Sequence, residues 1–144
     1  MSEGPAAMLR DFLLAYNEGE HEAAVANMAP DAQYVPILAA MEGRSFHGRE
    51  GALEFFRAID LDWEVFVLEP RDFYEHGDRG LALGTWRAKG RSSGLELSGQ
   101  PAAWMVVVRD GLIAYARTFM DRDQALEEFG VPAEELEAHR VELA

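Results

Sequence analysis

The residues in this sequence best suited to chemistry are Asp121 and Arg117, four positions apart at the end of an apolar segment. A carboxylate between apolar walls has its pKa raised by lost hydration, so Asp121 could serve as an acid or base near neutral pH. Arg117 could clamp a ligand carboxylate or enolate. Both also have structural readings. Asp121 with Gln124 fits a capping box, and Arg117 could pair with Asp121 and receive cation–π support from Trp104.

Aromatic side chains form a second group that could wall an apolar cavity, although such residues are more often core than ligand contacts. Trp86 stands out because small residues share its face of the expected strand. His47 precedes an expected helix and could reach the mouth of a pocket. The full set of candidate ligand-binding residues is Arg117, Trp104, Trp86, Tyr34, Tyr115, Phe119, Trp63 and His47.

Metal and cofactor motifs are missing from the sequence. No two histidines have the spacing of metal ligands, there is no cysteine, and the glycines at 90 and 94 flank a loop between two strands. A phosphate-binding loop would instead follow a strand and open a helix. We therefore expect neither a metal nor a cofactor.

The chain around Asp121 reads as a hairpin, because Asp110-Gly111 separates two apolar runs. Counting outward from a two-residue turn pairs Trp104 with Arg117 and places Phe119, Tyr115 and Asp121 on the same face. The other face would be small and uncharged, which predicts a two-fold homodimer through the sheet. Its residues are Ala103, Met105, Val107, Ala114, Ala116 and Thr118.

The remaining elements follow from hydrophobic periodicity and turn residues. The order of helices followed by a strand meander predicts an α+β fold. We expect one domain over 1–130, followed by an acidic helical tail over 131–144, and a loop over 39–47 covering the pocket mouth. The expected helices are 3–18, 20–28, 48–60 and 122–129, and the expected strands before the hairpin are 32–38, 62–75 and 81–89.

Composition limits the class of partner. The net charge is −13, from 26 acidic and 13 basic residues, which argues against binding to nucleic acid or to an anionic membrane surface. The lack of cysteine and of a signal-peptide pattern predicts a cytoplasmic protein.

Several short motifs resemble those of the NTF2-like superfamily, and within it the SnoaL-like polyketide cyclases and ketosteroid isomerases. They include Asn17-Glu18-Gly19-Glu20, Ala29-Pro30-Asp31-Ala32, Phe46-His47-Gly48-Arg49-Glu50, His76-Gly77-Asp78-Arg79, Arg109-Asp110-Gly111 and Met120-Asp121-Arg122. The resemblance implies a cystatin-like cone, in which a curved antiparallel sheet wraps around N-terminal helices. It also implies a pocket between sheet and helices and a homodimer.

The resemblance transfers little chemistry. The positions that match the ketosteroid isomerase base, oxyanion-hole tyrosine and protonated aspartate hold Pro36, Phe12 and Trp104. Steroid isomerisation by that mechanism is therefore not expected. The strand containing Arg87 has no carboxylate of the kind limonene epoxide hydrolases use. Both the epoxide hydrolases and the SnoaL-like cyclases also use an aspartate at the end of the last strand, and the matching position here holds Asp121.

These observations leave two functions open. The first is binding of a small hydrophobic molecule with a polar or anionic end, with Asp121 as the acid or base in a cofactor-free cyclase, isomerase or hydratase. The second is a non-catalytic ligand-binding or dimerisation module. A roomy pocket favours the first, and a pocket filled by its own side chains favours the second.

Overall fold

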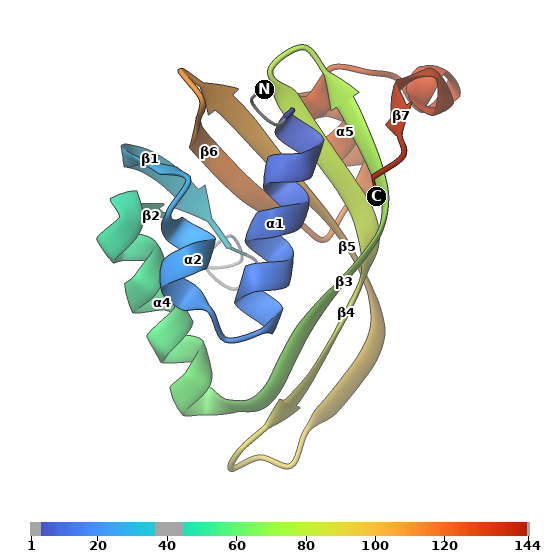
Figure 1. Cartoon of the computed structure of the whole chain (residues 1–144). Helices are drawn as coiled ribbons and strands as arrows, with labels where there is room; N and C mark the ends of the chain where they lie inside the picture. The colour runs from blue at the N-terminus through green and yellow to red at the C-terminus, as the bar shows by residue number, and fades with distance from the viewer. Residues whose placement is uncertain (1–3, 37–44, 144) are drawn as a thin grey trace.

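A computed structural model of the chain describes residues 4–36 and 45–143. A curved sheet wraps around the long helix α1, and α4 lies beside α1 on the same concave side (Figure 1). The helices are α1 (Pro5–Asn17), α2 (His21–Val25), α4 (Gly48–Asp62), α5 (Arg122–Phe129) and the 3-10 helix η1 (Ala133–His139). The strands are β1 (Met28–Val35), β2 (Phe46–His47), β3 (Trp63–His76), β4 (Arg79–Gly90), β5 (Glu96–Arg109), β6 (Leu112–Phe119) and β7 (Arg140–Val141).

The sheet has the strand order β2-β1-β6-β5-β4-β3-β7. The predicted antiparallel meander of β3 to β6 is confirmed, whereas β1 joins β6 in parallel. The strand expected at 32–38 begins earlier, at Met28. Of the loop predicted over 39–47, positions 39–44 lie outside the described residues, and the last two residues form β2.

Helix α1 buries the predicted stripe of Leu9, Phe12, Leu13 and Tyr16 against the sheet. Its first turn crosses β4 at Gly80, where a Cβ would lie 2.7 Å from the carbonyl of Pro5, so only glycine permits this approach. Its last residue, Asn17, bonds to the backbone of β3. The Asn17 amide donates to the Leu68 carbonyl at 2.6 Å and its oxygen accepts from the Leu68 N–H at 2.9 Å.

The predicted turn at Asp110-Gly111 is confirmed, with φ of 55° and 77° at the two residues and Arg109 paired with Leu112. The pairing predicted beyond the turn holds for Val108 with Ile113 and is wrong from there on. Val108 faces Ile113, but Val107 faces Tyr115, so Ala114 is an extra, bulged residue in β6. Trp104 consequently pairs with Thr118, and Arg117 pairs with Met105.

The bulge exchanges the two faces of β6 relative to β5. Trp104, Val106 and Ala116 join the main core beneath α1 and α4. On the other face, Ala103, Met105, Phe119 and residues of α5 form a second buried cluster. The expectation of an open, flat sheet face at Ala103 and Met105 is therefore wrong, because α5 covers them and leaves each no more than 2% exposed.

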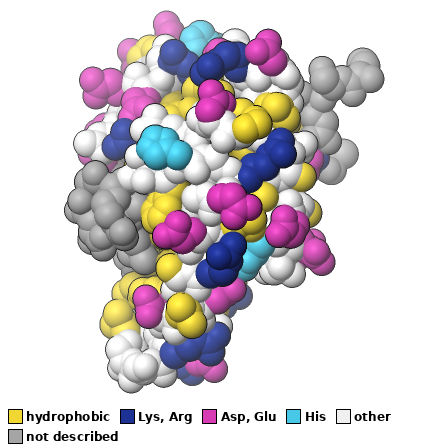
Figure 2. All heavy atoms as spheres, turned by 90° about the vertical axis from the view of Figure 1, so that its left-hand side faces the viewer, with side chains coloured by type: hydrophobic (Ala, Val, Ile, Leu, Met, Phe, Trp, Pro, Cys, Tyr) yellow, Lys and Arg dark blue, Asp and Glu magenta, His cyan; other side chains and the backbone are white. Residues whose placement is uncertain are grey.

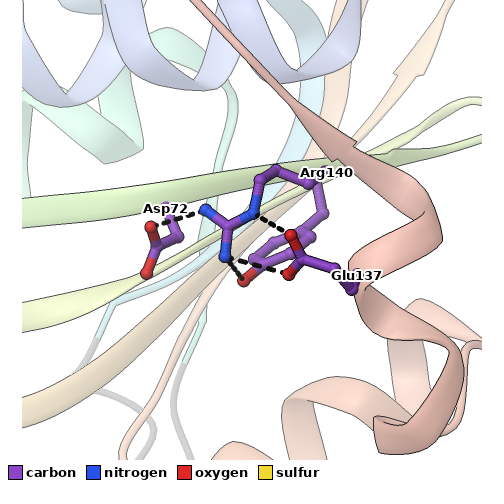
Figure 3. A network of polar contacts seen from close by, with 4 residues as sticks. Asp72, Glu137 and Arg140 are labelled. Atoms are coloured by element: carbon purple, nitrogen blue, oxygen red, sulfur yellow. Dashed lines mark hydrogen bonds and ion pairs between the residues drawn. The ribbon is translucent and has the colours of Figure 1, made fainter.

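The C-terminal residues return to the sheet. Leu136 of η1 is 3% exposed, and β7 pairs with β3 at Phe73 and Tyr74. Figure 3 shows the Arg140 guanidinium between two carboxylates, donating to Asp72 of β3 at 2.7 Å and to Glu137 of η1 at 2.8 Å. This ion-pair network fixes η1 and β7 against the free edge of β3.

Candidate functional site

A small cavity lies between the inner face of the sheet and the helices α1 and α4. Its volume is about 20 Å³, which is room for one water molecule or one oxygen atom of a ligand. We call it the aromatic cavity, because six of its nine lining side chains carry aromatic rings. The lining residues are Tyr16, Tyr34, Pro36, Phe55, Phe66, Leu68, Trp86, Trp104 and Thr118.

The polar side chains of the aromatic cavity are two indoles, which only donate hydrogen bonds, and three hydroxyls, which donate or accept. Trp86 and Trp104 are 6% and 3% exposed, and the indole N–H of each is buried without a hydrogen-bond partner among the described residues. A buried N–H of this kind costs about 1–3 kcal/mol when left unpaired. The indole N–H can only donate, so the group that would satisfy it is an acceptor oxygen.

The two tyrosine hydroxyls of the cavity stay protonated. Burial raises the pKa of Tyr16 and of Tyr34 well above the ordinary value of 10.0. The nearby charge of Asp60 raises the pKa of Tyr16 further, and Tyr16 does the same for Tyr34. No carboxylate, histidine or basic residue occurs among the described lining residues, so the cavity is neutral and rich in donors.

Three predicted site residues lie together here: Tyr34, Trp86 and Trp104. Sequence reasoning missed Tyr16 and Thr118 as polar members of the lining. Tyr16 was visible only as the last member of the apolar stripe of α1. Thr118 was assigned to the opposite face, and only the bulge at Ala114 places it opposite Trp104.

Arg117, Tyr115 and Phe119 lie on the other face of the sheet, so the prediction that they share a pocket with Trp104 is wrong. Arg117 donates to Glu128 of α5 at 2.6 Å, and the Tyr115 hydroxyl donates to the same carboxylate at 3.1 Å. The Arg117 guanidinium also stacks on Phe119, 4.5 Å from the ring centre. Arg117 therefore forms an ion pair and a cation–π contact, as its structural alternative predicted, but with other partners. The ion pair is with Glu128 and not Asp121, and the aromatic ring is that of Phe119 and not Trp104.

The remaining candidates lie outside the aromatic cavity. Asp121 is exposed and caps α5, its carboxylate accepting from the Asp123 N–H at 2.9 Å. His47 is exposed and directly precedes α4. Trp63 is half-buried at the start of β3 and lines a separate groove. Their predicted roles in binding or catalysis stay predictions.

Among the described residues, the side of the molecule that carries α4 has no continuous basic surface. Figure 2 shows acidic and basic side chains interspersed there, with hydrophobic side chains between them. In the described ranges, no three acidic or histidine side chains converge as a metal site would require. None of the described helices has the length and apolar character needed to cross a membrane.

Comparison with known proteins agrees with this geometry. The family model of the SnoaL-like domain matches residues 9–116. No curated protein matches the chain. Many solved structures share the fold, and three of them, at 18–21% identity, are described next.

The first is a Catenulispora acidiphila protein with a ketosteroid isomerase-like fold, in complex with trimethylamine. It is 18% identical with a TM-score of 0.71, over 92% of this chain and 98% of that one. The second, TerC co-crystallised with polyporic acid, is 21% identical with a TM-score of 0.69, over 85% and 95%. A candidate polyketide cyclase from Sinorhizobium meliloti is 20% identical with a TM-score of 0.60, over 78% and 94%.

Proposed function

This chain belongs to the SnoaL-like domain family, and from that premise we propose that it binds a small hydrophobic molecule through one carbonyl or enol oxygen. The observation that carries the proposal is the pair of buried, unpartnered indole N–H groups of Trp86 and Trp104 on the aromatic cavity. Because both groups only donate, an acceptor oxygen that reaches either of them would gain a hydrogen bond in an environment without competing water.

The neutrality of the cavity supports an uncharged or delocalised acceptor. With Tyr16 and Tyr34 protonated, the lining offers hydroxyl donors in addition to the indoles. Such a donor set stabilises negative charge as it develops on a carbonyl oxygen, as in an enolate. The relatives crystallised with polyporic acid or described as a polyketide cyclase are in keeping with this ligand class.

Binding is the core of the proposal, and catalysis would need a proton acceptor from elsewhere. Asp121 serves as a cap, outside the described lining of the cavity. We therefore name no described cavity residue as the acid or base of a cyclase, isomerase or hydratase reaction.

One observation favours the second candidate, a non-catalytic dimerisation module: the cavity volume of only about 20 Å³. Such a module would dimerise through the part of the outer sheet face that α5 leaves uncovered. Leu83, Pro101 and Met120 line a groove there, and Met120 is 52% exposed. A homodimer through this surface is compatible with either function, and sedimentation as a monomer at micromolar concentration would exclude it.

The experiment compares two ligands that differ only in the acceptor. Calorimetric titration with 1-tetralone and with tetralin, two-ring molecules with and without a carbonyl oxygen, measures what that oxygen contributes. We expect tetralone to bind at least ten-fold more tightly, and Trp104→Phe to remove most of that difference. Equal affinities, or no binding of either molecule, would leave the dimerisation module as the better reading.

A further inference from the structure

A second and much larger space adjoins the aromatic cavity at the foot of α1. It is a groove of about 590 Å³ between the α1–α2 turn, the end of α4 and the start of β3, which lie near one another in Figure 1. We call it the Trp63 groove. Its lining residues are Tyr16, Asn17, Gly19, His21, Asp60, Trp63, Glu64, Val65, Phe66, Val67, Arg87 and Arg91.

The groove and the cavity share a wall. Tyr16 and Phe66 line both spaces. The cavity holds about one oxygen atom, so the hydrocarbon body of any ligand whose oxygen occupies it must lie outside. The neighbouring space of about 590 Å³ is large enough for a two-ring body.

An aromatic path joins the two spaces. The Trp63 ring meets Phe66 edge-on, with centroids 5.7 Å apart, and Phe66 stacks on Trp86 at 5.4 Å and 24°. Tyr16 stacks on His21, with centroids 5.9 Å apart and planes 16° from parallel. Flat rings provide large apolar contact with few rotatable bonds, so a planar ligand would be favoured here.

We infer that the Trp63 groove holds the planar body of the ligand while its acceptor oxygen reaches the aromatic cavity between Tyr16 and Phe66. Phe66 is half-buried and lines both spaces, so this path requires its ring to move aside when the ligand binds. This inference rests on the proposed function, and adds where the ligand enters and what shape it has.

The three tryptophans make the inference directly testable, because the sequence contains only three indole N–H groups. Trp86 and Trp104 report on the cavity, and Trp63 reports on the groove. A nitrogen-15 correlation spectrum, assigned with Trp63→Phe, Trp86→Phe and Trp104→Phe, follows all three during titration with 1-tetralone. We expect all three signals to shift together with one dissociation constant.

Other patterns of chemical-shift change distinguish failure of the groove from failure of ligand binding in the cavity. Shifts of Trp86 and Trp104 with Trp63 unmoved would overturn the groove and leave cavity binding standing. A shift of Trp63 alone, or of none, would overturn both.

A matched pair of variants tests the shared wall. Phe66 and Phe73 are both half-buried phenylalanines of β3 that pack on the main core, but Phe73 lines neither space. We expect Phe66→Ala to raise the exchange rate of 1-tetralone at least ten-fold, and Phe73→Ala to leave it within two-fold. Similar rates in both variants would contradict the passage. If Phe66→Ala does not fold, Trp63→Leu should weaken tetralone binding at least five-fold, and unchanged affinity would overturn the groove.

Discussion

Replacing Trp104 by phenylalanine should stabilise the ligand-free protein, or leave its stability unchanged, while it weakens ligand binding. Trp104 is 3% exposed and its N–H has no partner in the described structure. Removing that donor recovers a desolvation cost of about 1–3 kcal/mol. The phenyl ring is roughly 40 Å³ smaller, and at about 24 cal/mol per Å³ the new space costs about 1 kcal/mol.

The two contributions leave a net change between zero and a gain of about 2 kcal/mol in the free energy of unfolding. Urea denaturation followed by far-ultraviolet circular dichroism measures it without depending on tryptophan fluorescence. Trp63→Phe is the matched control, because the Trp63 side chain is half-buried and its loss removes no orphaned donor. A loss of more than about 2 kcal/mol in Trp104→Phe would refute the reasoning, since it would mean that the N–H is satisfied in the folded protein.

Three further predictions concern residues around the site. Asp121→Asn should keep stability within about 0.5 kcal/mol and leave 1-tetralone affinity unchanged, whereas Asp121→Ala should lose about 1 kcal/mol in urea denaturation, because asparagine caps a helix as aspartate does. Glu128→Gln should cost about 1 kcal/mol through the ion pair with Arg117, while Glu127→Gln on the exposed side of α5 should change less than about 0.5 kcal/mol. Raised folded-state pKa values of Tyr16 and Tyr34 contribute stability that is fully present below the ordinary pKa of 10.0 and is lost as pH rises above it. The urea midpoint should therefore fall between pH 9 and pH 11, less steeply in Tyr34→Phe, and equal slopes in both proteins would contradict this.

Much of the fold could be predicted because its signals are local. The stripe of Leu9, Phe12, Leu13 and Tyr16 recurs at helical spacing, and all four side chains are buried in α1. Asp110-Gly111 supplies the two left-handed residues that a tight hairpin requires. Asp121 caps the start of α5 as expected, and the left-handed Gly130 ends this helix. Periodicity and turn chemistry act within a few residues, so the sequence alone reveals them.

The site was harder to predict because it depends on strand register. The alternation was correct along β5 and along β6 beyond the bulge, but the bulged residue Ala114 placed Ile113 and Tyr115 on opposite faces and shifted one strand against the other. That shift moved Arg117 from beside Trp104 to the opposite face and brought Thr118 in its place. A bulge leaves no pattern that periodicity can detect, since its cost and benefit lie in contacts with the neighbouring strand and helix.

The sequence by itself determined the order of elements, the helical stripe, the hairpin turn and the cap at Asp121, because each rests on neighbours in the chain. Only the tertiary structure decided the partner of Arg117, which is Glu128 of α5, and the meeting of Trp86 and Trp104 in one cavity. Those contacts join segments far apart in sequence. They are selected by the packing of whole faces against one another, and packing free energy is summed over the folded molecule rather than over a window of residues.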